Sequence, residues 1–344
     1  MPGETLSVRD GRPEDEPAVL ALLQSAFGPR SVEMFEWRYH HAPFRTAMLV
    51  LCDHNGAIMG CGVGAYPPGW VDGRPAVFSQ YGDLAVAHRG RGWGQLVAAA
   101  MHERAVGTVR YNFPAEHASK LVAAVGHPRA GRLPQWVRWA TPGALAESRG
   151  RELPGSVGSL VGLLLRAVRT LAGRPRSLTI EPLAEPGPEI DVLAEEAASF
   201  APCVLKRDAA FFRWRWLTQP DRQWHMSAAH DARGLLRGVV VYGIQTDWLH
   251  GGRPVGRVVD LLAHDATATR VLVDHAARWL ERAGCGMTLC DLNDPRSWSD
   301  RALIRAGFLP RGEGAVFHAN GGPGYESANL QSNWYLTMGD TDLV

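Results

Sequence analysis

Lysine is nearly absent from this sequence, in which only Lys120 and Lys206 represent it among 36 basic side chains. The 35 acidic residues almost balance the basic ones, so the formal net charge of the 344-residue chain is +1 at pH 7. A charge this close to neutral produces no overall field that would attract nucleic acid or an anionic membrane surface. We therefore expect no nucleic-acid partner.

Cysteine and long apolar segments are also scarce. The five cysteines include no Cys-x-x-Cys pair, which predicts reduced, buried thiols and no metal site. No stretch reaches the roughly 18 apolar residues of a membrane-spanning helix, and the first residues lack the basic and apolar regions of a signal peptide. The sequence therefore predicts a cytoplasmic protein without stable membrane insertion.

Glycine, in contrast, is abundant, and three glycines alternate within one short segment. Residues 83–86 are typical of a strand, and they lead to Gly90, Gly92 and Gly94 at the start of an amphipathic helix. Glycines at these positions let an anion approach the backbone, whose amides lie at the positive end of the helix dipole. The segment predicts a diphosphate-binding loop, and the alternative is an ordinary strand-to-helix turn.

The spacing of this loop limits the phosphate compound that it can bind. A nucleoside triphosphate loop has a Lys-Ser/Thr pair where this sequence has Gln95 and Leu96, and the fingerprint Gly-x-Gly-x-x-Gly of dinucleotide sites does not fit. The pattern Arg89-x-x-Gly92-x-Gly94 after a Leu-Ala-Val strand resembles the acetyl-CoA signature of the GNAT acyltransferases. The resemblance implies an acyl-CoA cosubstrate, either acetyl-CoA or a longer chain.

The same resemblance implies a set of cofactor-binding residues. In that family the strand backbone pairs with the pantetheine arm, the loop amides hold the diphosphate, and two later residues contact the lower pantetheine and the adenosine phosphates. The residues at these places are Leu84, Ala85 and Val86 on the strand, Arg89, Gly90, Arg91, Gly92, Trp93, Gly94 and Gln95 in the loop, and Asn112 and Ser119 further on.

The sequence also repeats itself at an offset of 177 residues. Phe-Glu-Trp-Arg-Tyr at residues 35–39 corresponds to Phe-Arg-Trp-Arg-Trp at residues 212–216. With a small shift, Gly-Arg-Pro at residues 73–75 then corresponds to the same tripeptide at residues 252–254. One structural unit therefore occurs twice.

Within each unit the periodicity is that of an α/β domain. In the first unit we predict helices and strands in the following order: a strand at Val8, a helix over 14–27, a helix with the aromatic cluster, strands over 47–52, 57–65 and 75–86, a helix over 95–106, a strand over 108–113 and a helix over 116–125. This order is that of the GNAT fold, and the resemblance covers residues 5–141 and 178–318.

We therefore predict an α/β fold with a mixed sheet and two GNAT-like lobes in tandem. Residues 1–145 form the N-terminal lobe with the CoA site, 146–177 a linker helix, and 178–344 the C-terminal lobe. In the second unit Asp265, Ala268 and Arg270 replace the arginine and two glycines of the loop. An acid repels phosphate and side chains block its approach to the backbone, so this lobe is expected to be a degenerate, acceptor-side scaffold.

Direct acyl transfer needs a general base near the strand that carries the thioester. Asp83 is the first candidate because it is the ionisable residue nearest the acyl end of that strand, and His88 is the second. Both have counterparts in the second unit, Asp260 and His264, so a structural role is an equal alternative for Asp83. Val122 replaces the tyrosine that serves as the acid in the family, which leaves the thiolate to depart unassisted or through water.

Twelve tryptophans is a high number for this length, and large aromatic side chains often line pockets. The aromatic clusters at residues 35–39 and 212–216 are expected in the core, because they recur in the unit without the phosphate loop. Six of the tryptophans outside these clusters are the predicted pocket residues: Trp70, Trp93, Trp136, Trp139, Trp248 and Trp298.

A tandem protein with one working loop offers a cleft between its lobes that suits a large acceptor. The architecture resembles that of N-acyltransferases that place a long fatty chain on the aminosugar of glycopeptide antibiotics, which implies a role in antibiotic biosynthesis. We expect a small-molecule or glycopeptide amine as the acceptor. Three alternatives remain: a mycothiol-synthase-like acetyltransferase, an aminoacyl-tRNA-dependent peptidoglycan-bridge enzyme and a non-catalytic CoA-binding protein. The lack of a basic surface argues against the tRNA-dependent class.

Overall fold

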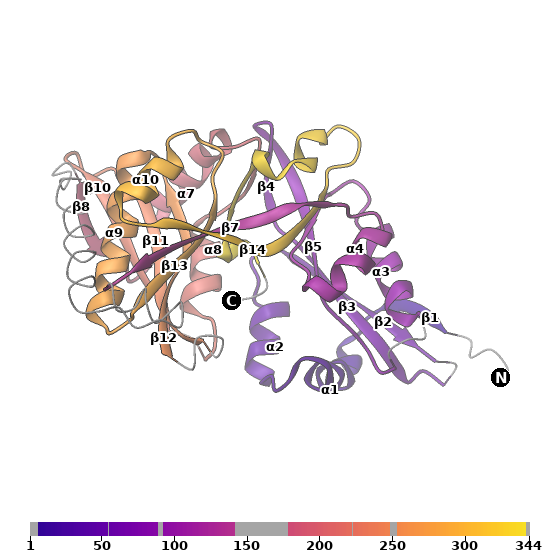
Figure 1. The fold of residues 1–344 in the computed structure, drawn as a ribbon. Helices are drawn as coiled ribbons and strands as arrows, with labels where there is room; N and C mark the ends of the chain where they lie inside the picture. Colours follow the sequence, from indigo (N-terminus) through magenta and orange to yellow (C-terminus); the bar gives the residue numbers. More distant parts are fainter. Residues whose placement is uncertain are drawn as a thin grey trace.

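Strands from both halves of the chain form one continuous system of paired strands (Figure 1). This computed structural model describes residues 6–53, 55–88, 92–141, 178–221, 223–247 and 253–341. Helices pack on both faces of the strands, so the predicted α/β class with a mixed sheet is confirmed. The linker helix predicted at 146–177 lies outside the described residues.

In the first half of the chain the strands follow the order β1-β2-β3-β5. The elements of this half are β1 (Ser7–Asp10), α1 (Glu16–Phe27), α2 (Val32–Tyr39), β2 (Arg45–Cys52), β3 (Ile58–Tyr66), β4 (Pro68–Val71), β5 (Arg74–Val86), α3 (Trp93–Arg104), β6 (Val109–Asn112), α4 (Ser119–Ala124) and β7 (Arg129–Trp139). The helices and strands that the periodicity predicts are present within a few residues of their expected bounds, whereas β4 and β7 were not predicted.

β2 separates two apolar layers because its side chains alternate between the faces of the sheet. Val50 packs with Leu23 of α1 on one face. Leu49 and Leu51 pack with Val97 of α3 on the other. The two helices therefore cover opposite faces, and α3 starts close to the end of β5.

In the second half the order is β8-β10-β11-β12, followed by the parallel strand β13. The elements are β8 (Leu178–Pro182), α7 (Pro188–Glu196), β9 (Cys203–Leu205), α8 (Ala209–Phe212), a π-helical turn (Arg213–Leu217), β10 (His225–Asp231), β11 (Leu236–Asp247), β12 (Arg253–Ala263), α9 (Ala266–Arg282), β13 (Met287–Asn293), α10 (Ser299–Arg305), β14 (Leu309–Asn320) and β15 (Trp334–Thr337).

The two halves exchange one strand each. β7, from the first half, pairs antiparallel with β13, and β14, from the second half, pairs antiparallel with β6. The exchanged strands also pair with each other across the middle of the molecule (Figure 1). Each half therefore completes its set of strands with one from the other half.

A second connection joins the halves beside the exchanged strands. β4 and the start of β5 form a hairpin, and β4 also pairs with β9 of the second half. β9 pairs in parallel with β15, which in turn pairs with the end of β13. This chain of strands brings residues 338–341 next to β5, where Gln80 Nε2 donates a hydrogen bond to the main-chain oxygen of Asp340 (3.0 Å).

Candidate active site

β5 and β6 separate at the point where β5 bulges. The parallel pairing between them joins residues 78–80 to residues 109–111. Further along, Asp83 and Leu84 together stand opposite one residue of β3, and Asp83 has a left-handed backbone conformation (φ 49°). Because a bulge bends a strand and increases its twist, the end of β5 turns away from β6 and a wedge opens between the two strands.

The predicted pantetheine strand forms one side of this wedge. Ala85 and Val86 pair with Cys61 and Gly60 of β3 through one edge of β5. The opposite edge faces the wedge, in the position from which a main chain can hydrogen-bond an extended ligand. Contact of residues 84–86 with pantetheine stays a prediction.

Asn112 lies where the pairing of β5 with β6 ends. Its side-chain oxygen accepts a hydrogen bond from the main-chain nitrogen of Tyr81 (2.8 Å), and its Nδ2 donates to Nδ1 of His127 (3.0 Å). His127 is fully buried, and burial together with nearby positive groups lowers its pKa to about 3. Asn112 therefore links β5 to His127 at the narrow end of the wedge. Its contact with the cosubstrate stays a prediction.

Ser119, the first residue of α4, is bonded to an exchanged strand. Its Oγ lies 2.7 Å from Nε2 of His318 on β14, and Nδ1 of the same ring lies 2.6 Å from the main-chain oxygen of His127. Because the ring nitrogen that faces a carbonyl must carry the proton, Nε2 accepts the hydroxyl hydrogen of Ser119. The second half of the chain thereby orients a residue predicted to bind the cosubstrate.

Helix α3 begins without a side-chain cap among the described residues. Its N-cap is Gly92, in the left-handed region (φ 76°), which favours glycine. A Cβ built at Gly94 meets only Leu121, at 3.8 Å, so the helix start is open. Uncapped amides at a helix N-terminus attract an anion. The predicted loop residues Arg89, Gly90 and Arg91 lie outside the described residues, and Gln95 is exposed beside the helix start.

Two other predicted residues lie near this helix start. Trp93 is buried with Leu49 and Leu51, so its indole belongs to the core under α3. His88 is exposed and makes an edge contact with the Trp93 ring (5.4 Å between centroids). It does not line the cavity described below, and its role as a base remains a prediction.

In the second half, residues of the chain occupy the two places that correspond to the start of α3 and to the wedge between β5 and β6. The carboxylate of Asp265 caps α9 by accepting hydrogen bonds from the main-chain nitrogens of Thr267 and Ala268, both at 2.9 Å. β12 and β13 pair over residues 256–258 and 288–290, after which residues 292–293 of β13 pair with β15. Side chains of β15 also bond to β12, Tyr335 to the main-chain oxygen of Leu261 and Thr337 to Asp260. A carboxylate therefore occupies the helix start, and a strand occupies the space beside β13.

Asp83 is buried between two arginines. Arg30 Nη2 lies 2.8 Å from Oδ1 and Arg38 Nε lies 3.3 Å from Oδ2, to which the hydroxyl of Tyr39 also donates. Burial alone would raise the pKa of this carboxyl, but the two guanidinium groups outweigh it and hold the pKa below its ordinary value. A carboxylate in this setting accepts a proton poorly at neutral pH. Its contacts suit an anchor for Arg38 and Tyr39, while the predicted role as base is untested.

The same cluster occurs again 177 residues later. Arg207 Nε lies 3.0 Å from Oδ1 of Asp260, and Trp216 Nε1 donates to Oδ2 (3.2 Å). These three residues correspond by position to Arg30, Asp83 and Tyr39. Since the second half has a filled wedge and a capped helix, the repetition of the cluster favours a structural role for Asp83.

A cavity lies between the two halves, along Gln80, Gly82 and Asp83 of β5. The centre of a water-sized sphere can occupy about 70 Å³ of it, within an empty space of about 720 Å³ that includes open solvent. Tyr39 of the first half and Trp214 of the second contribute aromatic walls.

The aromatic clusters lie mainly in the core as expected, with Phe35, Trp37, Phe212 and Trp216 buried, but one aromatic member of each cluster lines this cavity. Both Tyr39 and Trp214 belong to the repeated clusters that were expected in the core, and they line the cavity because the clusters meet where the halves join. The predicted pocket residues Trp70, Trp93, Trp136, Trp139 and Trp298 do not line it, and Trp248 lies outside the described residues.

Three further observations concern the sequence-based exclusions. All five cysteines are buried and free, as predicted. No helix in the described part of the chain is long and apolar enough to cross a membrane. Over the same residues, no group of three or more histidine, cysteine, aspartate or glutamate side chains is placed to hold a metal ion.

Solved structures share this fold, although no protein-family model and no curated protein matches the chain. A GCN5-related N-acetyltransferase from Anabaena variabilis has a TM-score of 0.65 at 12% identity, with 92% of this chain and 73% of that chain covered. Another from Kribbella flavida has a TM-score of 0.60 at 17% identity, covering 92% and 71%. N-myristoyltransferase from Saccharomyces cerevisiae with bound myristoyl-CoA has a TM-score of 0.56 at 10% identity, covering 93% and 80%. The likeness extends over both halves of the chain and shows a common fold.

Proposed function

We propose that the protein is an acyl-CoA-dependent N-acyltransferase with one cosubstrate site, in its N-terminal half. The contrast between the two halves carries the proposal. In the first half a wedge between β5 and β6 adjoins the start of α3, which no side chain caps within the described part of the chain. In the second half β15 and the Asp265 carboxylate occupy both places. The fold shared with N-acetyltransferases and an N-myristoyltransferase supports the same conclusion.

The repeat in the sequence and the strand pairing support a tandem arrangement of two GNAT-like lobes. The proposed lobes comprise residues 1–145 and 178–344, joined by a linker over 146–177. Exchange of β7 and β14 ties the lobes together, so we expect neither lobe to fold independently. The degenerate lobe then serves as a scaffold that supplies one wall of the acceptor site.

The proposed reaction is direct transfer of the acyl group to a primary amine. The acceptor nitrogen forms a bond to the thioester carbonyl carbon, the C–S bond breaks, a base takes the proton from nitrogen, and CoA leaves as the thiolate. The cavity reaches Gln80 and Asp83 on the same strand that borders the wedge. The acceptor would therefore approach from the cavity while the pantetheine arm lies in the wedge.

The aromatic walls of the cavity suit an acceptor with apolar surface. The acceptor we propose is the aminosugar of a glycopeptide antibiotic, whose free amine receives a long acyl chain. The bound myristoyl-CoA of the yeast N-myristoyltransferase is a reason to compare donors of different chain length.

Thermal unfolding with acetyl-, octanoyl- and decanoyl-CoA tests the cosubstrate site. A ligand at 100 times its Kd stabilises the folded state by about 2.7 kcal/mol. Gly94→Glu should abolish this stabilisation because it places a carboxylate at the helix start, where the Cβ itself meets no close neighbour. A shift that grows with chain length supports a lipid donor, and an equal shift supports acetyl transfer.

Arg270→Glu is the matched control, because Arg270 is the counterpart of Gly94 at the start of α9 and is partly exposed. It should leave the acyl-CoA shift intact. Loss of the shift in both variants, or in neither, would contradict a single N-terminal site. Thiol release from acyl-CoA in the presence of primary amines then separates an enzyme from a protein that only binds CoA.

A further inference from the structure

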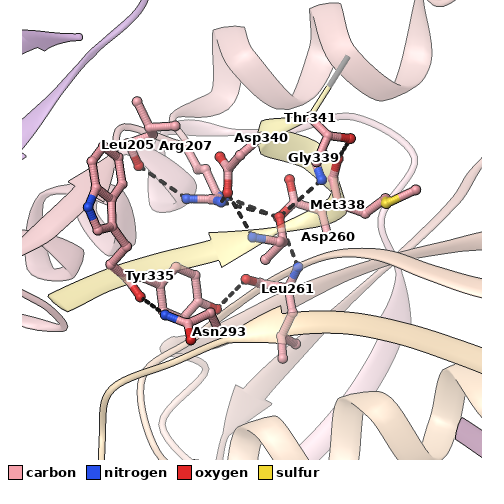
Figure 2. A network of polar contacts seen from close by, with 12 residues as sticks. Leu205, Arg207, Asp260, Leu261, Asn293, Tyr335, Met338, Gly339, Asp340 and Thr341 are labelled. Carbon is pink, nitrogen blue, oxygen red and sulfur yellow. Dashed lines mark hydrogen bonds and ion pairs between the residues drawn. The ribbon is translucent and has the colours of Figure 1, made fainter. Parts of the chain in front are cut away.

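One buried arginine is shared by two buried carboxylates (Figure 2). Arg207 Nε lies 3.0 Å from Oδ1 of Asp260, and its Nη2 contacts Oδ2 of Asp340. The side chains of all three residues are at most 1% exposed. One positive charge therefore faces two negative charges in a site with little access to water.

The two carboxylates differ in their remaining partners. Oδ1 of Asp260 also accepts from Thr337 Oγ1 (2.9 Å), and its Oδ2 accepts from Trp216. Oδ2 of Asp340 accepts from Arg207 and from the main-chain nitrogen of Thr337 (2.7 Å). Oδ1 of Asp340, although buried, has no hydrogen-bond partner among the described residues. Leaving a buried acceptor without a donor costs desolvation free energy, and such acceptors are rare in folded proteins. This oxygen is therefore suited to accept a hydrogen bond from a ligand.

Asp340 lies at the acyl end of the proposed cosubstrate site. It lines the cavity together with Asp83, which belongs to the bulge of β5, and Gly82, which precedes the bulge. Its main-chain oxygen accepts a hydrogen bond from Gln80 Nε2 (3.0 Å), which ties the C-terminal segment to the same strand.

The other charged residues of the cavity wall have partners. Asp83 is bound by two arginines, as described above, and Lys206 pairs with Glu195 (2.8 Å). Arg215 donates to the main-chain oxygen of Thr341 and lies over aromatic rings. The cluster of Arg207, Asp260 and Asp340, in contrast, has one more carboxylate than guanidinium groups, and Asp340 is its member in the cavity wall.

We propose that the amine of the acceptor binds against Oδ1 of Asp340 and that this carboxylate takes the amine proton during acyl transfer. The proposal depends on the acyl transfer proposed above and names its base. As the N–C bond forms and the C–S bond breaks, the proton moves from nitrogen to Oδ1 and CoA leaves as the thiolate. Solvent then protonates the thiolate, and Asp340 passes its proton to water that enters the cavity once the products have left.

The ionisation of Asp340 suits this role. Burial, together with the charge of Asp260, raises the pKa of the Asp340 carboxyl to about 6 against the opposing effect of Arg207. A base with a pKa near the working pH is ionised at rest and still strong enough to accept a proton. The pKa of Asp83, by contrast, lies below its ordinary value.

The pH dependence of kcat in the wild-type protein is the first test, with the primary amine that gives the fastest thiol release. Because kcat reports the complex in which the amine is already bound, its acid limb should have an apparent pKa near 6. A kcat that is unchanged between pH 5 and 8 would overturn the assignment, whether or not any variant folds.

Asp340→Asn is the second test, and Asp260→Asn is its control. Asp340→Asn should reduce kcat by about 100-fold or more and remove the acid limb from the pH profile of kcat. Its affinity for acyl-CoA, measured by thermal shift, should stay within a few-fold of the wild-type value. Asp260→Asn disturbs the same arginine, yet it should retain an acid limb, moved to lower pH because the charge of Asp260 no longer raises the pKa of Asp340. Wild-type kcat and an intact limb in Asp340→Asn would refute the role of Asp340. No thiol release by the wild-type protein with any amine would instead refute the proposed function.

Discussion

Trp37 and Trp214 bind each other's main chain where the two halves of the protein meet. Nε1 of Trp37 donates to the carbonyl oxygen of Trp214 (2.8 Å), and Nε1 of Trp214 donates to the carbonyl oxygen of Trp37 (2.9 Å). Their rings stack with centroids 5.2 Å apart and an interplanar angle of 18°. The two residues are 177 positions apart, the same offset that relates the repeated segments. Reciprocal contacts of this kind define a local two-fold relation between corresponding elements.

Trp37→Phe should destabilise the protein by about 0.5–1.5 kcal/mol, because it removes one of two hydrogen bonds to the carbonyl oxygen of Trp214 and leaves the one from Thr218 Oγ1 (3.1 Å). Trp214→Phe should also destabilise the protein, since it removes the reciprocal hydrogen bond to the carbonyl oxygen of Trp37. Urea unfolding measures both free energies. A large effect of one variant with none from the other would contradict a symmetric junction.

Asp83→Asn should lower the free energy of unfolding by about 3–5 kcal/mol at neutral pH, because it leaves two partly buried arginines without their shared partner. The folded-state pKa of Asp83 is depressed, so its contribution is present above the unfolded-state value of about 3.9 and is lost as the pH falls through the folded-state pKa. The variant should therefore show a weaker loss of stability below pH 4, measured by urea unfolding between pH 2 and 7.

The same variant separates an anchor from a base. If Asp83→Asn kept wild-type stability and acyl-CoA binding but lost turnover by 100-fold, Asp83 would be the base and the anchoring role would be refuted.

His127→Gln should flatten the pH dependence of stability between pH 5 and 7. The pKa of His127 is lowered to about 3, so the unfolded chain binds a proton below about pH 6.5 while the folded protein does not. This difference makes wild-type stability fall as the pH decreases from 6.5, by up to about 2 kcal/mol at pH 5. Urea unfolding at pH 5 and 7 measures it. His117→Gln, at an exposed position, should keep the wild-type slope.

Local patterns in the sequence were sufficient for most elements of the first half. The apolar spacing of residues 14–27 predicts a helix, and α1 spans Glu16–Phe27. The long apolar segment before the glycines predicts a strand over 75–86, and β5 spans Arg74–Val86. These predictions succeed because the buried face of each element is encoded by neighbouring residues.

The strand exchange could not be predicted in the same way. β7 and β14 have the same alternation whichever sheet they join, because alternation reports burial of a face and not the identity of the partner strand. The contact of Ser119 with His318, 199 residues apart, follows from this exchange. Similarly, the pairing of Asp340 with Arg207 depends on the place where β15 enters the second half.

The sequence alone determined the repeat, the α/β class, the glycine loop before α3 and the replacement of its residues in the second unit, because each is a property of residues close together in the chain. Only the tertiary structure decided that the halves exchange strands and that the aromatic clusters meet at a cavity. It also decided that Asp340, in the wall of that cavity, pairs with Arg207. These features arise from contacts between residues far apart in the chain, and their energies depend on burial and geometry that no local pattern specifies.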